Sequence, residues 1–91
     1  MNPFRFEFSP HSERAFALFD KTFQRRLLDK LDFFEQASDT MSHAKKLNGL
    51  ENTYRFRVGD YQVLVRPRED GSLVILVILK IARRKDIYEN L

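Results

Sequence analysis

Apolar and polar positions alternate in two parts of the chain, as they do in β-strands with one buried face. The segment "FRFEF", residues 4–8, separates three phenylalanines from Arg5 and Glu7. The segment "YRFRVGDYQVLVRP", residues 54–67, alternates on both sides of Gly59-Asp60, a pair typical of a tight hairpin turn. The pattern therefore predicts strands at 4–8, 53–58 and 61–67, the last two joined as a hairpin.

A third stretch, "LVILVILKIA" at residues 73–82, is apolar at every position through Leu79. A continuous apolar run of this length is typical of a strand that is buried on both faces in the middle of a sheet. The pair Asp70-Gly71 just before it is a second hairpin signal. We therefore expect a strand at 73–82 that pairs with the one at 61–67.

Between the first two strands the apolar period changes to three or four, which is the period of a helix. The stripe consists of Phe16, Phe19, Phe23, Leu27, Leu31 and Phe34. Ser9 before Pro10 is a good helix start, and Asp20 or Thr22 offers a second one. The pattern therefore predicts two helices with a break near 20–22. Residues 38–53 have no sustained period and predict a loop with room for one helical turn.

These elements give the order β-α-α-β-β-β in a single domain, residues 1–91. The fold class is α+β, a small antiparallel sheet with two helices packed on one face. The other face of the sheet carries Arg55, Arg57, Gln62, Leu64, Arg66 and Lys80.

Composition excludes several classes of protein. The absence of Cys rules out disulfides and thiolate metal sites, and His11 and His43 lie too far apart in the sequence to indicate a zinc site. There is no P-loop, glycine-rich dinucleotide turn or Ser-His-Asp set, so we expect no cofactor and no metal. The segment 73–79 is too short to span a bilayer and the N-terminus does not look like a signal peptide, so a cytoplasmic protein without a membrane partner is expected.

The charge of the chain is unevenly distributed. Residues 1–44 carry six Lys or Arg and seven Asp or Glu, a net charge of −1, whereas residues 45–91 carry ten and six, a net charge of +4. The basic half is the half predicted to form strands, which suggests a polyanionic partner. The alternative is that a total of +3 only keeps a small domain soluble.

Arg55 and Arg57 are the residues most suited to anion chemistry. Guanidinium groups bind phosphate in a bidentate way. Two residues that are two positions apart on a strand lie on the same face, about 7 Å from each other. Such a pair can hold a scissile phosphate and stabilise the charge of its transition state. The alternative is that both arginines form the solvated side of an amphipathic strand.

The segments "LNGLENTYRFRVGDYQVLV", 47–65, and "VILVILKIARRKDIYENL", 74–91, resemble the RelE/ParE superfamily of type II toxin–antitoxin toxins. The shared features are Leu47-x-Gly49, the hairpin with Val-Gly-Asp-Tyr, and an apolar strand followed by a basic cluster and a tyrosine. The resemblance covers roughly residues 45–90. It favours the RelE-like branch, whose members are mRNA interferases that cut mRNA in the ribosomal A site by metal-independent attack of a 2′-OH on the neighbouring phosphate.

Carried over by position, the resemblance implies roles for particular residues. Arg55, Arg57 and Arg83 would hold phosphate and stabilise charge, and Tyr88 would stack on a base or take part in proton transfer. The implied RNA-binding residues are Gln62, Lys80, Arg84 and Lys85. The implied partners are a cognate antitoxin that covers Arg55 or Arg57, with Leu64 as a docking point, and the ribosome with its mRNA.

Two departures from the family pattern leave alternatives open. Gln62 stands where the family usually has Arg, and Ala82-Arg83 where many members have His. Arginine stays protonated and is a poor general base, so the proton acceptor would be Tyr88, Lys80, Lys85, an acidic residue, the RNA or the ribosome. The alternatives are a ParE-like toxin that inhibits DNA gyrase without nuclease activity, and a relic that only binds its antitoxin.

Overall fold

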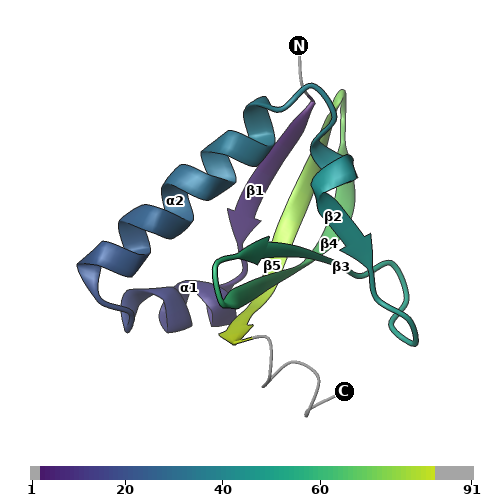
Figure 1. Ribbon diagram of the computed structural model, residues 1–91. Helices are drawn as coiled ribbons and strands as arrows, with labels where there is room; N and C mark the ends of the chain where they lie inside the picture. Colours follow the sequence, from purple (N-terminus) through teal and green to yellow (C-terminus); the bar gives the residue numbers. More distant parts are fainter. Residues whose placement is uncertain (1–2, 84–91) are drawn as a thin grey trace.

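The computed structural model describes residues 3–83 and contains two α-helices beside one sheet (Figure 1). The elements in chain order are β1 (Phe4–Phe8), α1 (Pro10–Ala17), α2 (Lys21–Gln36), the 3-10 turn η1 (Thr40–His43), β2 (Ala44–Lys46), β3 (Tyr54–Val58), β4 (Tyr61–Asp70) and β5 (Leu73–Arg83). The α+β class, the two helices and the four predicted strands are confirmed, and strands β4 and β5 are slightly longer than expected.

The sheet differs from the expected one in two respects. Its strand order is β1-β5-β4-β3-β2, and β1 runs parallel to β5 while the other neighbours are antiparallel. The sheet is therefore mixed, and β2 is an additional strand inside the segment predicted as a loop. A strand of three residues, Ala-Lys-Lys, is too short to show an alternating pattern and is held by its pairing with β3.

Both helices begin at the predicted residues. The hydroxyl of Ser9 accepts a hydrogen bond from the Ser12 N–H at 3.1 Å, with Pro10 in the first helical turn. The carboxylate of Asp20 accepts from the Phe23 N–H at 2.8 Å, which starts α2 and confirms the break between the helices. Each cap satisfies an N–H that a helix would otherwise leave unpaired at its start.

The core lies between α2 and the sheet. From the helix, Leu27, Leu31 and Phe34 are buried against β-strand residues that include Phe56. The Phe56 ring lies 4.9 Å from that of Phe34 and 5.1 Å from that of Phe6 on β1. The aromatic stripe of the helices is therefore core, as its period indicates, and it fixes the helices to one face of the sheet.

The pairing of β4 with β5 contains an irregularity. Val65 pairs with Ile78, but the preceding residue Leu64 pairs with Lys80, so the register passes over Leu79. One extra residue in a strand is a β-bulge, and it shifts the alternation of the following side chains by one position. In β5 the even-numbered residues therefore face the helices before the bulge, and the odd-numbered residues face them after it.

The effect of this bulge is visible in what β5 contributes to the core. Leu76 and Ile78 before the bulge, and Ile81 after it, all pack in the helix-side core. Ala82 instead packs in a second cluster, away from the helices. By alternation, Arg83 at the end of the strand returns to the helix side.

Two hairpin turns are formed by glycines with positive φ, +60° at Gly59 and +63° at Gly71. We expect Gly59→Ala and Gly71→Ala each to lower the free energy of unfolding by about 1–2 kcal/mol, because a Cβ is unfavourable in this conformation. A Cβ at Gly59 would also lie 2.6 Å from Arg26 Nη2, whereas one at Gly71 meets no atom within 4 Å. Since the end of the exposed Arg26 side chain can move aside, urea denaturation should give similar losses for both variants. A much larger loss for Gly59→Ala would show that the contact with Arg26 is fixed.

Candidate functional site

The sheet face that points away from α1 and α2, called here the open face, is basic. Its side chains are those that alternate with the helix-side core residues. The charged side chains on this face are Arg5, Glu7, Lys45, Arg55, Arg57, Arg66, Arg68, Asp70 and Lys80. The carboxylate of Glu7 forms an ion pair with Arg68 at 3.4 Å. The strand order therefore brings the cations predicted for this face close to one another.

Two cross-strand rows place these groups beside one another. Lys45, Arg55, Leu64 and Lys80 are successive partners across β2, β3, β4 and β5. Neighbouring strands are about 4.8 Å apart, so the row brings three cations within roughly 15 Å. Lys45 was missed by the sequence patterns because β2 was not predicted, although a Lys pair shortly before Leu47-x-Gly49 is visible in the sequence.

In the adjacent row, Arg57 pairs with Gln62 and Gln62 with Ala82. The side chain of Arg57 is exposed, whereas that of Gln62 is fully buried. Gln62 was predicted to contact RNA, but its side chain is buried and is not accessible on the open face.

An apolar patch lies within the basic face. It consists of the buried residues Leu47, Leu64 and Ala82, with Leu50 and Leu79 packed against them. Charges beside apolar surface interact more strongly than charges surrounded by water, because the local dielectric constant is lower. Arg55 and Lys80 therefore lie beside apolar side chains and are not surrounded by water on all sides.

Two polar groups at this place have unmet hydrogen bonds. Among the described residues, neither amide atom of Gln62 nor the Nε of Arg55 has a partner, although all three atoms are buried. An unsatisfied buried polar group costs about 1–3 kcal/mol and is rare in ordinary cores. Arg55 and Gln62 are diagonal neighbours on the open face, so these atoms lie in one place.

Arg83 is not brought together with Arg55 and Arg57. Its Nε donates to the Tyr61 hydroxyl at 3.4 Å, and its guanidinium lies 5.8 Å from the Tyr61 ring. That ring packs against Phe19 and Phe23 of the helical layer, so the Arg83 side chain lies on the helix side of β5. The predicted site residues Arg84, Lys85 and Tyr88 lie outside the described residues.

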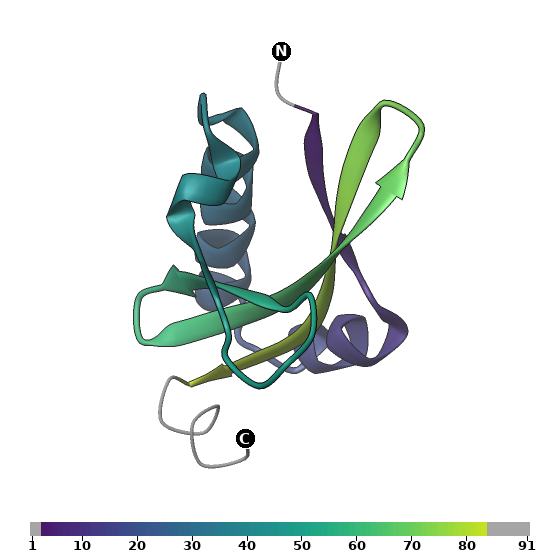
Figure 2. The same ribbon diagram turned by 90° about the vertical axis from the view of Figure 1, so that its right-hand side faces the viewer.

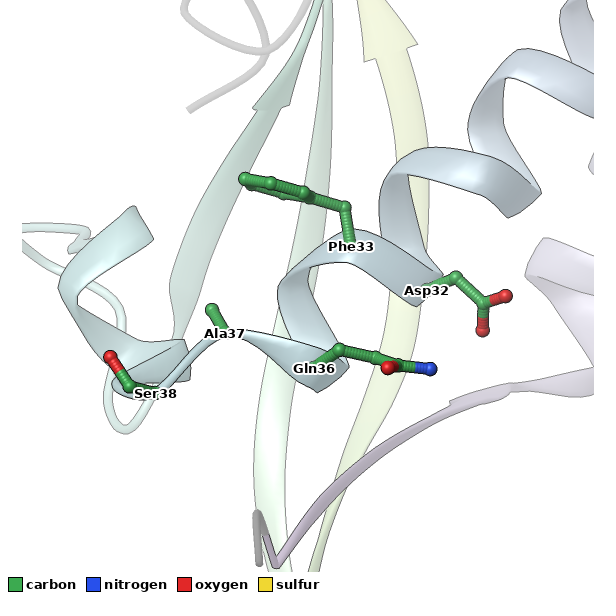
Figure 3. A pocket seen from close by; sticks show the side chains of 5 residues that line it. All are labelled: Asp32, Phe33, Gln36, Ala37 and Ser38. Atoms are coloured by element: carbon green, nitrogen blue, oxygen red, sulfur yellow. The ribbon is translucent and has the colours of Figure 1, made fainter.

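Other features of the described chain add no second reactive centre. A pocket of about 530 Å³ at the end of α2 is lined by Asp32, Phe33, Gln36, Ala37 and Ser38, and Figure 3 shows that these side chains do not point toward a common centre. His43 packs its ring against Phe33 and Phe34. Within residues 3–83, no three His, Asp or Glu side chains are grouped as metal ligands.

The described part of the chain has no helix that is both long enough and apolar enough to cross a membrane.

Comparison with known proteins adds evidence about the fold. No protein-family model matches the chain, and no curated protein sequence matches it. The solved structure of the toxin–antitoxin complex RelBE2 from Mycobacterium tuberculosis matches 90% of this chain and 99% of its own, with 22% identity and a TM-score of 0.70. The archaeal RelE–RelB complex from Pyrococcus horikoshii matches 90% and 96%, with 26% identity and a TM-score of 0.63.

A YoeB/ParE toxin from Agrobacterium tumefaciens matches 88% of this chain and 98% of its own, with 14% identity and a TM-score of 0.63. These proteins share the arrangement of helices and sheet with this chain at low sequence identity. The match spans nearly the whole of each chain and agrees with the family pattern in the sequence. The chain therefore has the RelE-like toxin fold.

Proposed function

We propose that this protein is the toxin of a type II toxin–antitoxin system and cleaves mRNA in the ribosomal A site. The observation that carries the proposal is the pair Arg55 and Arg57 on the open face, in a row with Lys45 and Lys80 and beside an apolar patch. Guanidinium and ammonium groups gathered on one face favour a phosphate ligand, and RNA is rich in phosphates. The RelE-like fold supports the same class of activity.

In the proposed reaction, a ribose 2′-oxygen attacks the phosphorus of its own 3′-phosphate. The 2′-O–P bond forms as the bond from phosphorus to the 5′-oxygen breaks, which leaves a 2′,3′-cyclic phosphate and a 5′-hydroxyl. Arg55 and Arg57 would stabilise the negative charge that gathers on the phosphate oxygens. The proton of the 2′-OH goes to a base and the leaving oxygen receives one. Neither arginine is suited to be that base, because arginine stays protonated.

The remaining predicted residues enter this proposal with different support. Lys80 lies in the same row as Arg55 and is proposed to bind RNA. Gln62 would have to become accessible before it could donate its amide hydrogen bond. Arg83 and Tyr88 stay predictions as catalytic residues, as do Arg84 and Lys85 as RNA-binding ones.

The test is primer extension on an mRNA in a reconstituted translation system, with and without the purified protein. We expect new 5′ ends within A-site codons, and none when ribosomes are left out. The dependence on ribosomes separates this activity from that of a contaminating ribonuclease. Intact mRNA at saturating protein would contradict the proposed activity.

A second candidate function is inhibition of DNA gyrase without nuclease activity. It is favoured by Gln62 in place of a cation, by the position of Arg83 on the helix side, and by the fold match to a YoeB/ParE toxin. A supercoiling assay with purified gyrase distinguishes the two. Inhibited supercoiling together with intact mRNA would establish this second function in place of the first.

We further propose that a cognate antitoxin covers the open face with an acidic or amphipathic segment over Arg55 or Arg57. Opposite charge and the apolar patch would both favour such a segment. Neutralisation would then be steric and electrostatic, because the segment would occupy the same surface as the RNA. A complex in which both arginines remain accessible would contradict this arrangement.

A further inference from the structure

The basic face continues beyond the proposed reaction centre onto one arm of a hairpin. Strand β3 pairs with β4 only up to Val65, so the rest of β4, Arg66–Asp70, has β5 on one side and no neighbour among the described strands on the other. Figure 2 shows this hairpin of β4 and β5 extending away from β3. Arg66 and Arg68 both lie on the open face of this arm.

The register adds a third cation to the same place. Ile75 of β5 is the partner of Arg68 on one side and of Arg5, from β1, on the other. Arg5, Ile75 and Arg68 therefore form one cross-strand row, and Arg66 lies in the next row beside Val77 and Glu7. Arg5 of β1 and the two arginines of β4 thus form one group of cations, with the carboxylates of Glu7 and Asp70 on the same face.

Contacts within this group hold the arginine side chains along the sheet. Arg66 Nη2 donates to the Thr53 hydroxyl at 3.4 Å, and Arg68 Nη2 donates to the Glu7 carboxylate at the same distance. Ile75 is only 8% exposed although neither α1 nor α2 covers the open face. The aliphatic stems of long charged side chains commonly cover apolar surface while their charged ends stay in water, and the flanking arginines are placed to do so here.

We propose that Arg5, Arg66 and Arg68 form a second binding site for the phosphate backbone of single-stranded RNA, separate from the reaction centre. This inference rests on the proposed function, since it makes the arm a path for the RNA strand that continues away from Arg55 and Arg57. Along β4, Arg66 and Arg68 lie about 7 and 13 Å from Leu64, the partner of Arg55, at 3.3–3.4 Å per residue. Arg66 thus joins the reaction centre to the arm, and the phosphates held on the arm are not the reacting one, so these contacts act on RNA affinity.

The first experiment measures binding of a fluorescent single-stranded RNA to the purified protein by anisotropy over a series of salt concentrations. Each phosphate contact contributes about 0.7 to the slope of log affinity against log salt for a single strand. The double variant Arg66→Ala, Arg68→Ala should therefore reduce the slope by about 1.4 and weaken binding roughly 25-fold at 0.1 M salt. The variant Arg66→Lys, Arg68→Lys keeps both charges and should keep most of the slope.

The matched control is Arg14→Ala, Arg25→Ala, which removes two exposed cations from the helices. It has the same net charge as the double alanine variant, so an equal reduction of the slope in both would overturn the proposal. A reduction confined to Arg66→Ala, Arg68→Ala supports it. Thermal unfolding of each variant shows that the fold is kept.

The second experiment separates this inference from the proposed function. In the reconstituted translation system, the double alanine variant should need more ribosome–mRNA complex for half-maximal cleavage and reach the same rate at saturation. If the wild type does not cleave mRNA, the proposed function fails while the salt slopes still decide on the RNA site. If the wild type cleaves and the variant matches it in both slope and half-saturation, only the second site is overturned.

Discussion

Replacing Arg55 and Arg57 together by alanine is expected to lower the rate of ribosome-dependent mRNA cleavage by at least about 10³-fold. Removing a single donor to a charged transition state commonly costs about 10²–10³-fold, and here both guanidinium groups opposite the phosphate are lost. Primer extension under single-turnover conditions measures the rate directly. The effect should appear in the rate at saturation, because these two groups act on the reacting phosphate.

Two companion variants show whether the loss is specific. Arg55→Lys, Arg57→Lys keeps the charge but loses the bidentate geometry, so an intermediate rate is expected. Arg14→Ala, Arg25→Ala on the helices removes the same charge from another surface and should cleave at the wild-type rate. Cleavage by the Arg55, Arg57 alanine variant at close to the wild-type rate would show that the two arginines are only the solvated side of β3.

Truncation of Phe56 to alanine is expected to lower the free energy of unfolding by about 3–5 kcal/mol. The side chain is fully buried, and its ring contacts Phe6 on β1 and Phe34 on α2. Removing it leaves a cavity where the sheet, its edge strand and the long helix meet. Because small domains are stabilised by only about 5–15 kcal/mol in total, much of the stability would be lost. Urea denaturation of the purified variant measures the change.

The matched control for this prediction is Phe33→Ala. Phe33 precedes Phe34 on α2, yet its side chain is 54% exposed and contacts Lys30 and His43 at the surface. Its removal should cost about 1 kcal/mol or less, because most of the ring is already in water. Losses of equal size at the two positions would mean that Phe56 is not at the centre of the core.

The helices and the long strands could be predicted because their signals are local. Ser9 and Asp20 cap the helices through contacts three residues away, and alternation is visible within each strand. The parallel pairing of β1 with β5 joins positions about 70 residues apart, such as Phe4 and Val74, and no local pattern encodes it. The three residues of β2 depend on β3 for their conformation.

The site was predicted in part for the same reason. Arg55 and Arg57 were identified because β3 alternates, so the side of each residue follows from its neighbours. Arg83 was grouped with them through the resemblance to the RelE/ParE family, and its position on the helix side could not be counted from the apolar run of β5. Lys45 and the burial of Gln62 depend on strand order and on the apolar patch, which are features of the assembled sheet.

The bulge at Leu79 has a consequence for which substitutions β5 can tolerate. Up to residue 78 the even-numbered positions point into the helix-side core, and from residue 81 the odd-numbered ones do. A polar residue at 76 or 81 would thus be buried among apolar side chains, whereas at 77 or 82 it would face away from that core. Deleting Leu79 would remove the bulge and leave a regular alternation, in which Lys80 still faces the open side and Ile81 still faces the helix-side core.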